Sequence, residues 1–354
     1  MAENNYVDTR GAVKEPVPFT EAVIEGLAPG GGLFVPQDIP TFSLDEIVSL
    51  ADAPYAQRAA RVYKAFGVDL PDETVDALMA QAYGDNFDDE AICPITSLDD
   101  KTHVLELWHG PTSAFKDMAL SILPHLMTTA AKKNGVKNEI VILTATSGDT
   151  GKAAMAGFAD VPGTRIIVFY PKNGVSPIQE KQMVTQKGDN TYVVGITGNF
   201  DDAQTAVKKM FNDRELSAEL NEAGFQFSSA NSINWGRLVP QIVYYFSTYC
   251  DLINMGKIKA GDKINVVVPT GNFGNILAGY YAKKMGLPIK TLVCASNSNN
   301  VLTDFLKTGT YDKNRKFYTT TSPSMDILIS SNLERLLYHM SDGDDKLIKD
   351  LMNQ

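Results

Sequence analysis

One lysine in the sequence has the surroundings of a reactive amine. It is Lys116, in the run HGPTSAFKD at residues 109–117. The glycine and proline exclude a regular element at the start of this run, and apolar residues recur at helical spacing from Phe115 to Leu126, so we expect a helix that begins near residues 113–115. Lys116 would lie in its first turn, where the positive helix end lowers the pKa of an amine. A free amine condenses with aldehydes, which makes Lys116 a candidate nucleophile. The alternative is a lysine that lies over apolar surface beside its acidic neighbour.

A glycine-rich loop, TGNFGN at residues 270–275, separates an apolar run from the helical pattern ILAGYYAKKMG. Its glycines allow a close approach of the backbone, while N–H groups and a helix N-terminus point at an anion. The spacing is not GxGxxG and no lysine follows for the phosphates of a nucleotide, which favours the monophosphate of a cofactor. The alternative is a tight turn between strand and helix.

A second loop, TSGDTGK at residues 146–152, also follows an apolar strand pattern. Two residues separate its glycines where a Walker sequence has four, and Ala153 replaces the hydroxyl residue that binds magnesium, so a nucleotide hydrolase is a poor match. Its hydroxyl and N–H groups at a helix N-terminus suit a carboxylate or phosphate of a substrate. The alternative is a capping cluster in which Asp149 or Thr150 caps the following helix.

The elements that would position these loops alternate between strand and helix. We expect strands at residues 139–146, 165–170, 191–196 and 263–268, with a helix at residues 201–211. Continuous apolar strands alternating with helices indicate a parallel sheet covered on both faces, an α/β fold whose ligands bind at the carboxyl ends of strands. The first 100 residues indicate a mixed region, with helical patterns at residues 43–66 and 72–83 and a turn at the three glycines of residues 30–32.

Composition excludes several classes of protein. The chain has 354 residues, which suggests two or three domains, and its 44% hydrophobic and 21% charged residues are ordinary for a globular protein. We find no apolar stretch of membrane-spanning length and no apolar signal core, so we expect a cytoplasmic protein. The net charge of −10 argues against nucleic-acid and membrane partners. The widely spaced Cys93, Cys250 and Cys294 indicate reduced thiols, with no disulfide frame and no metal site.

Three motifs resemble those of threonine synthases, which use pyridoxal 5'-phosphate (PLP). In chain order they are HGPTSAFKD, similar to the lysine motif, TSGDTG, similar to the substrate loop, and GNFGN, similar to the phosphate loop. Four further segments resemble the longer bacterial and fungal branch of that family. They are YVDTRG at residues 6–11 and the segments at residues 19–40, 231–246 and 322–335. The resemblance covers residues 6–335. Members of this branch usually continue further, so the resemblance implies that the usual C-terminal part, with the residue facing the pyridine nitrogen, is missing.

The resemblance implies the β-family PLP fold, that is, fold type II, similar to the tryptophan synthase β subunit. This fold has two α/β lobes with parallel-rich sheets, here preceded by a mixed α+β region. We expect the N-terminal region at residues 1–100, a lobe with the lysine and the substrate loop at 101–215, and a lobe with the phosphate loop at 216–354. The protein would be a monomer or homodimer.

The resemblance also implies roles for individual residues. Lys116 would hold PLP covalently, and His109 would position the loop before it. The residues expected to hold the cofactor phosphate are Gly271, Asn272, Phe273, Gly274 and Asn275. Those expected near the substrate carboxylate or the ring hydroxyl are Ser147, Gly148, Asp149 and Thr150. The candidates for the substrate phosphate are Arg237, Asn234, Ser232 and Lys181, with Arg237 favoured for its bidentate geometry; a structural ion pair is the alternative for Arg237.

The implied reaction converts O-phospho-L-homoserine and water into L-threonine and phosphate, the last step of threonine biosynthesis. The protein would be a PLP-dependent carbon–oxygen lyase acting on a phosphate, in which Lys116 moves protons between neighbouring carbon atoms. A hydroxyamino-acid dehydratase or a sulfhydrylase of the same fold is one alternative, because both would share the lysine and a glycine loop. Neither needs a second phosphate pocket, so dependence on a substrate phosphate separates them from the synthase. Another is a catalytically silent, synthase-like protein that binds PLP or a phosphorylated amino acid.

Overall fold

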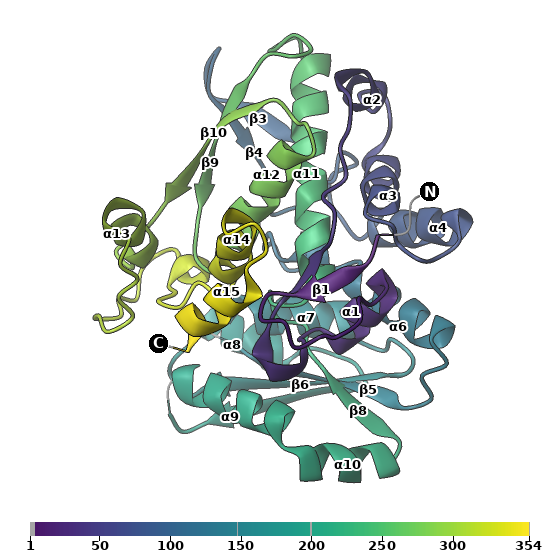
Figure 1. Ribbon diagram of the computed structural model, residues 1–354, viewed down its shortest axis with the longest axis vertical. Helices are drawn as coiled ribbons and strands as arrows, with labels where there is room; N and C mark the ends of the chain where they lie inside the picture. Colours follow the sequence, from purple (N-terminus) through teal and green to yellow (C-terminus); the bar gives the residue numbers. More distant parts are fainter. Residues whose placement is uncertain (1–3, 147, 199, 354) are drawn as a thin grey trace.

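The computed structural model describes residues 4–146, 148–198 and 200–353 (Figure 1). Its N-terminal part consists of short elements, as follows: β1 (Tyr6–Asp8), α1 (Phe19–Glu25), the 3-10 turn η1 (Pro29–Gly31), β2 (Phe34–Pro36), α2 (Leu44–Ser49), α3 (Tyr55–Ala65) and α4 (Asp72–Ala82). These confirm the mixed region expected before residue 100, including the turn at the three glycines and the helices after residue 43. The two strands pair antiparallel, with Val7 opposite Val35.

A four-stranded parallel sheet forms the middle of the chain, in the order β7-β6-β5-β8. The elements of this part are β3 (Ile95–Ser97), β4 (His103–Leu105), α5 (Asp117–Leu120), α6 (Leu123–Lys133), β5 (Glu139–Ala145), α7 (Asp149–Phe158), β6 (Thr164–Pro171), α8 (Pro177–Val184), β7 (Thr191–Ile196), α9 (Phe200–Asn212), α10 (Arg214–Glu222) and β8 (Phe225–Ser228). The strands expected from the sequence match β5, β6 and β7 within a residue or two, and β8 was not expected.

Successive side chains of β5 point to opposite faces of the sheet, and both faces are apolar. Val141 and Leu143 pack in a cluster with Val207 of α9, while Ile140 and Ile142 belong to the main core. Helices α9 and α10 therefore cover one face and α7 the other, as Figure 1 shows. This is the α/β arrangement that the continuous apolar strands predict.

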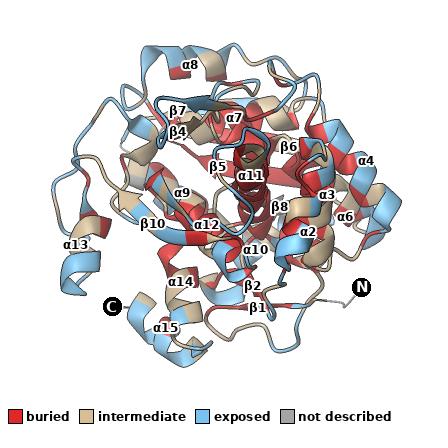
Figure 2. Ribbon diagram, turned by 90° about the horizontal axis from the view of Figure 1, so that it is seen from above, coloured by how far each residue is buried: buried red, intermediate tan, exposed pale blue. Residues whose placement is uncertain are grey.

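The last part of the chain surrounds a long buried helix. Its elements are α11 (Trp235–Asn254), β9 (Ile264–Pro269), α12 (Gly274–Lys284), β10 (Ile289–Ala295), α13 (Val301–Thr308), the 3-10 turn η2 (Pro323–Met325), α14 (Leu333–Met340) and α15 (Asp345–Met352). Helix α11 contacts α3, α5 and α12, and Figure 2 shows it buried at the centre of the molecule. Strands β9 and β10 pair parallel. The expected division at residues 100 and 215 stays a prediction; β8, which follows residue 215, pairs with β5.

The N-terminal strands are joined to α14 near the other end of the chain. Glu334 accepts a hydrogen bond from the Thr9 hydroxyl at 2.6 Å and two from the Arg10 guanidinium at 2.8 Å each. The neighbouring Arg335 donates to the Phe34 carbonyl at 2.9 Å and is buried. These contacts place α14 against β1 and β2.

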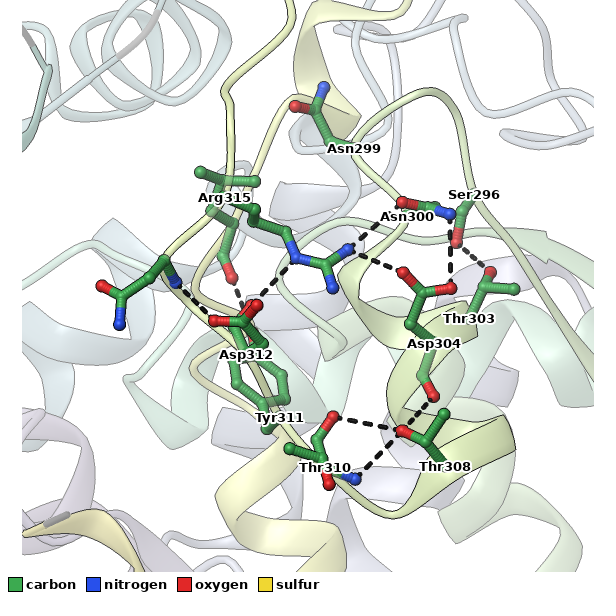
Figure 3. Close-up of polar contacts among 12 residues, drawn as sticks. Ser296, Asn299, Asn300, Thr303, Asp304, Thr308, Thr310, Tyr311, Asp312 and Arg315 are labelled. Carbon is green, nitrogen blue, oxygen red and sulfur yellow. Dashed lines mark hydrogen bonds and ion pairs between the residues drawn. The ribbon is translucent and has the colours of Figure 1, made fainter.

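A polar network connects α13 with the segment that follows it, before α14 (Figure 3). The Arg315 guanidinium donates to Asp304 at 2.8 Å and to the Asp312 carbonyl at 2.9 Å. The Tyr311 hydroxyl donates to the Leu328 carbonyl and accepts from the Ser330 N–H, each at 2.8 Å. Through Tyr311 this network fixes the segment that precedes α14.

Two further properties follow from the described residues. None of the helices in the parts described above is long and apolar enough to cross a membrane. The three cysteines are unpaired thiols, with Cys93 and Cys250 buried and Cys294 half-buried.

Candidate active site

Lys116 is almost completely buried, with 6% of its surface exposed. Its Nζ lies 3.6 Å from Asp149 Oδ2 and 4.7 Å from the centre of the Phe115 ring. The pKa of Lys116 is lowered to about 8, mainly by burial; Asp149 opposes the shift, and the Arg237 charge adds to it. About a tenth of the amine is therefore uncharged at pH 7.

The loop before Lys116 is fixed by Asp117. The Asp117 carboxylate accepts hydrogen bonds from the N–H and the hydroxyl of Thr112 at 2.8 and 2.7 Å, and burial raises its pKa. Ser113 has a φ of +54°, which no helix accepts, so α5 begins at Asp117 and the helix start expected at residues 113–115 is wrong. The cause expected for the low pKa, a helix end, is also wrong, because α5 has only four residues and burial is the largest cause.

The apolar pattern from Phe115 to Leu126 is divided between two helices. Helix α5 ends at Leu120 and α6 begins at Leu123. Pro124 has no N–H to donate to the carbonyl of residue 120, which removes one hydrogen bond from a continuous helix and favours the break. The break leaves Lys116 at the start of a short, buried turn that packs against α11 and α7.

The substrate loop predicted from TSGDTG leads from β5 into α7. The Thr146 hydroxyl accepts hydrogen bonds from the N–H groups of Gly148 and Gly151, both at 2.9 Å. Gly148 is the N-cap, and neither Asp149 nor Thr150 caps the helix with its side chain, so the capping alternative is wrong. Ser147 lies outside the described residues.

Asp149 is held in place by partners that the sequence interpretation missed. Its Oδ1 accepts a hydrogen bond from Gln179 Nε2 at 2.6 Å and lies 3.9 Å from Lys152 Nζ. Gln179 also explains why residue 148 is a glycine, because a Cβ at this position would lie 2.3 Å from Gln179 Oε1. Lys152 could have been found from its i+3 spacing to Asp149, which puts both on one helix face. Gln179, on α8, gives no such signal.

The phosphate loop predicted from GNFGN connects β9 with α12. Phe273, the N-cap of α12, has a φ of +69° and makes no capping bond with its side chain. Asn272 Oδ1 accepts a hydrogen bond from the Gly274 N–H at 3.0 Å, so an anion would be bound by the N–H groups that follow in the first turn. A small cavity has Phe115, Gly271, Asn272 and Asn275 among its walls. The loop therefore lies beside the residue that precedes Lys116, and the structure brings these two motifs together.

Two residues after η2, Ser330 and Asn332, bind the backbone of the phosphate loop. The Ser330 hydroxyl donates to the Gly271 carbonyl at 2.5 Å, and the Asn332 N–H donates to the Asn272 carbonyl at 3.0 Å. Gly271 has no room for a side chain, because a Cβ there would lie 3.1 Å from the Ser324 carbonyl oxygen. The close backbone of η2 therefore favours a glycine at position 271 and fixes the loop on that side.

Comparison with known proteins gives the family. A model described as the N terminus of threonine synthase matches residues 5–83, and one described as pyridoxal-phosphate dependent enzyme matches residues 98–349. Threonine synthase of Saccharomyces cerevisiae is 39% identical over an alignment of 373 residues including gaps, which covers 99% of this chain and 70% of the yeast protein. The chain belongs to the threonine synthase family.

Two other members are similar over nearly the whole chain. The structure of a PLP-bound threonine synthase from Brucella melitensis superimposes with a TM-score of 0.90 at 41% identity, covering 99% of this chain and 73% of that one. The human protein named threonine synthase-like 1 is 46% identical over 346 residues, which cover 95% of this chain and 46% of the human protein. The chain thus spans about half the length of its threonine synthase-like 1 relatives. The family match confirms fold type II and PLP as the cofactor.

The residues of this threonine synthase family member fit that cofactor. A phosphorylated pyridine aldehyde needs a reactive amine and a site for its phosphate. The Lys116 amine lies 4.7 Å from the centre of the Phe115 ring, and Phe115 lines one cavity with the phosphate loop. The Asn275 side chain accepts hydrogen bonds from Tyr244 at 2.6 Å and Tyr245 at 2.9 Å, which fix the end of the loop. The individual contacts to PLP stay predictions.

Two of the four candidates for the substrate phosphate lie at the start of α11, Arg237 in its first turn and Asn234 as its N-cap. Arg237 is buried, donates to the Ala230 carbonyl at 2.5 Å and has an unpartnered Nε; burial lowers its pKa to about 10. Asp117 is near enough to raise the pKa of Arg237 against the effect of burial, but among the described residues no carboxylate forms an ion pair with Arg237, so the ion pair named as the alternative is not observed. Asn234 caps α11 through the Gly236 N–H, and its amide donates to the Val23 and Ser229 carbonyls. All its polar atoms are thereby used by the fold.

The other two candidates differ in position. Ser232 accepts a hydrogen bond from Asn272 Nδ2 at 2.8 Å, so it joins the residues just before α11 to the phosphate loop. Lys181 is exposed on α8. His109 lies between Glu106 and Asp88, at 2.8 and 2.5 Å, and the first of these is the main reason why its pKa is raised. These contacts agree with the positioning role expected for His109.

Proposed function

We propose that the protein converts O-phospho-L-homoserine and water into L-threonine and inorganic phosphate. The observation that carries the proposal is the unpartnered Nε of Arg237, buried close enough to Lys116 to lower the pKa of its amine. The cofactor phosphate accounts for the glycine loop at the start of α12. A second cationic donor beside the reactive amine is what a second phosphate, on the substrate, requires.

The chain's own side chains suit the proton transfers of this reaction. PLP, when bound, supplies an electron sink for charge that develops on the substrate. The Lys116 amine, with a pKa of about 8, can accept a proton from one carbon and return it to a neighbouring carbon. Asp149, 3.6 Å from Lys116, offers a negative charge that stabilises the ammonium while it carries the proton. Arg237 would hold the substrate phosphate and stabilise it as it leaves.

The experiment is a visible absorption spectrum of the purified chain with PLP, taken before and after addition of O-phospho-L-homoserine. Released phosphate and L-threonine are assayed in the same sample. The expected result is a PLP band that the Lys116→Ala variant lacks, together with equal amounts of both products. The matched control is Lys187→Ala, because Lys187 is exposed on the surface.

Other outcomes identify the alternatives. A Lys116-dependent band with no product from any substrate would indicate a silent binding protein. Turnover of an unphosphorylated hydroxyamino acid, with no gain from the phosphate group, would indicate a dehydratase. The absence of a band in the wild-type chain would contradict the role of Lys116.

A further inference from the structure

A second buried lysine, Lys152, lies next to the reactive one. It is on the first turns of α7, with 9% of its surface exposed. Its Nζ donates a hydrogen bond to the Thr112 carbonyl at 3.0 Å and lies 3.9 Å from Asp149 Oδ1. Burying an ammonium costs free energy unless it is paired. Here the hydrogen bond to Thr112 and the Asp149 carboxylate together offset that cost.

Asp149 consequently lies between two lysines. Its Oδ2 faces Lys116 at 3.6 Å, while its Oδ1 faces Lys152 at 3.9 Å and accepts the hydrogen bond from Gln179 at 2.6 Å. Neither lysine forms a close ion pair with this carboxylate. Because Asp149 interacts with both lysines, it stabilises the Lys116 ammonium less than it would in an ion pair with Lys116 alone.

We propose that Lys152 is a positioning residue for Lys116: it shares the Asp149 carboxylate and joins α7 to the loop that precedes Lys116, so that the Lys116 amine stays free to react. The contact with Thr112 fixes the distance between the two segments. The shared carboxylate prevents Asp149 from holding Lys116 as an ammonium. The inference rests on the proposed role of Lys116.

The surrounding charges are consistent with this arrangement. The charged groups facing Lys116 are Asp149 and Lys152 of α7 and Arg237 of α11; its sequence neighbour Asp117 faces Lys152 and Arg237. Burial is the main cause of the low pKa of Lys116, Asp149 opposes it, and Arg237 and Lys152 both lower it. Removal of the Lys152 charge therefore favours the Lys116 ammonium.

The test measures how fast PLP attaches to Lys116 at different pH values. In this step the amine nitrogen adds to the aldehyde carbon and water leaves, so the rate follows the fraction of free amine. Attachment is followed by visible absorption of the apoprotein after mixing with PLP. Borohydride reduction and peptide mass mapping then identify the lysine that carries PLP.

Two variants remove the charge of Lys152, and one keeps it. Lys152→Gln retains a donor for the Thr112 carbonyl, Lys152→Met retains the approximate length of the side chain, and Lys152→Arg retains the charge. The matched control is Lys187→Gln, because Lys187 lines the same surface groove as Lys152 but is exposed. Thermal unfolding of each variant shows whether it is folded.

For both neutral variants we expect attachment at pH 7 to be about three- to tenfold slower, with the midpoint of the pH profile moved upward and the rates converging above pH 9. Lys152→Arg and Lys187→Gln should keep the wild-type profile within about twofold. A wild-type profile in a folded neutral variant, even one of lower thermal stability, would overturn the proposal, since it would leave Lys152 a purely structural role. PLP attached to a lysine other than Lys116 in the wild-type chain would instead contradict the proposed function.

Discussion

Lys116 Nζ lies 3.6 Å from Asp149 Oδ2, just beyond hydrogen-bonding distance and within the range of an ion pair. A closer contact inside the protein would hold the lysine as an ammonium, and no carboxylate at all would leave its protonated form without support. The observed separation suits an amine that must exist in both forms. The first two predictions follow from it.

The rate of PLP attachment should follow the pKa of Lys116. Burial lowers that pKa to about 8, so about a tenth of the amine is free at pH 7, compared with well under a thousandth for an ordinary lysine. The amine gains reactivity as it loses its proton, so the rate should rise with pH and level off above pH 8. Free Nα-acetyl-lysine is the control, and its rate should keep rising beyond pH 9. A profile that parallels this control would contradict the low pKa.

Asp149→Asn should move the same profile in the opposite direction from the Lys152 variants. Asp149 raises the pKa of Lys116, so its removal lowers that pKa and moves the midpoint below pH 8. The amide oxygen of asparagine can keep the hydrogen bond from Gln179. The control is Asp189→Asn, which changes an exposed carboxylate. An unchanged or raised midpoint for Asp149→Asn would refute this assignment.

Arg237→Lys should weaken the binding of the phosphorylated substrate more than that of PLP. Lysine keeps the charge but lacks the planar fork of donors, so KM for O-phospho-L-homoserine should rise about tenfold or more. Steady-state kinetics with phosphate release give KM, and the absorption band reports retained PLP. If KM stays at the wild-type value while the variant is folded, Arg237 has only a structural role, through its hydrogen bond to the Ala230 carbonyl.

Gly271→Ala should reduce PLP affinity with little loss of Lys116 reactivity toward small aldehydes. The added Cβ would meet the Ser324 carbonyl and the Met325 Cα at 3.1 Å, and these backbone atoms cannot move without displacing the phosphate loop. Overpacking of this kind costs about 1–3 kcal/mol, or about a five- to 150-fold weaker binding of PLP. Gly84→Ala is the matched control, since its Cβ meets its nearest neighbour at 3.4 Å. Equilibrium titration with PLP measures both variants.

Glu334→Gln should destabilise the fold through its contacts with the N-terminal strands. It weakens the three hydrogen bonds that Glu334 accepts from Thr9 and Arg10, and bonds to a buried charged group contribute about 1.5–3 kcal/mol. Urea unfolding should show a lower midpoint. Asp76→Asn removes an exposed ion pair with Lys64 and should cost less than about 0.5 kcal/mol. Equal losses in the two variants would contradict the importance of this junction.

The sequence predicts the parallel sheet and its loops well because their signals are local. Continuous apolar runs locate β5, β6 and β7, and glycines after β5 and β9 locate both loops. The strand β8 was missed because FQFS is short and alternates between apolar and polar residues, unlike the buried strands beside it. The start of α5 was missed because an unusual φ at Ser113 gives no signal in composition.

The site could be predicted only in part. The motifs predict Lys116 and the phosphate loop, and the structure places Phe115, the neighbour of Lys116, and the phosphate loop around one cavity. Gln179 was missed because α8 meets α7 only in the folded chain. Asn234 looked like a ligand residue because its motif was matched, but capping a helix uses the same polar atoms that would bind a substrate.

The junction of the N-terminal strands with α14 also affects the order in which the chain can fold. Thr9 and Glu334 are 325 positions apart, so the ribosome has synthesised nearly all of the described chain before this contact can form. Until then the side chains of Thr9 and Arg10 lack these hydrogen bonds. Synthesis of α14 is therefore the event that lets the N-terminal segment make this junction, and a nascent chain halted before residue 334 lacks it.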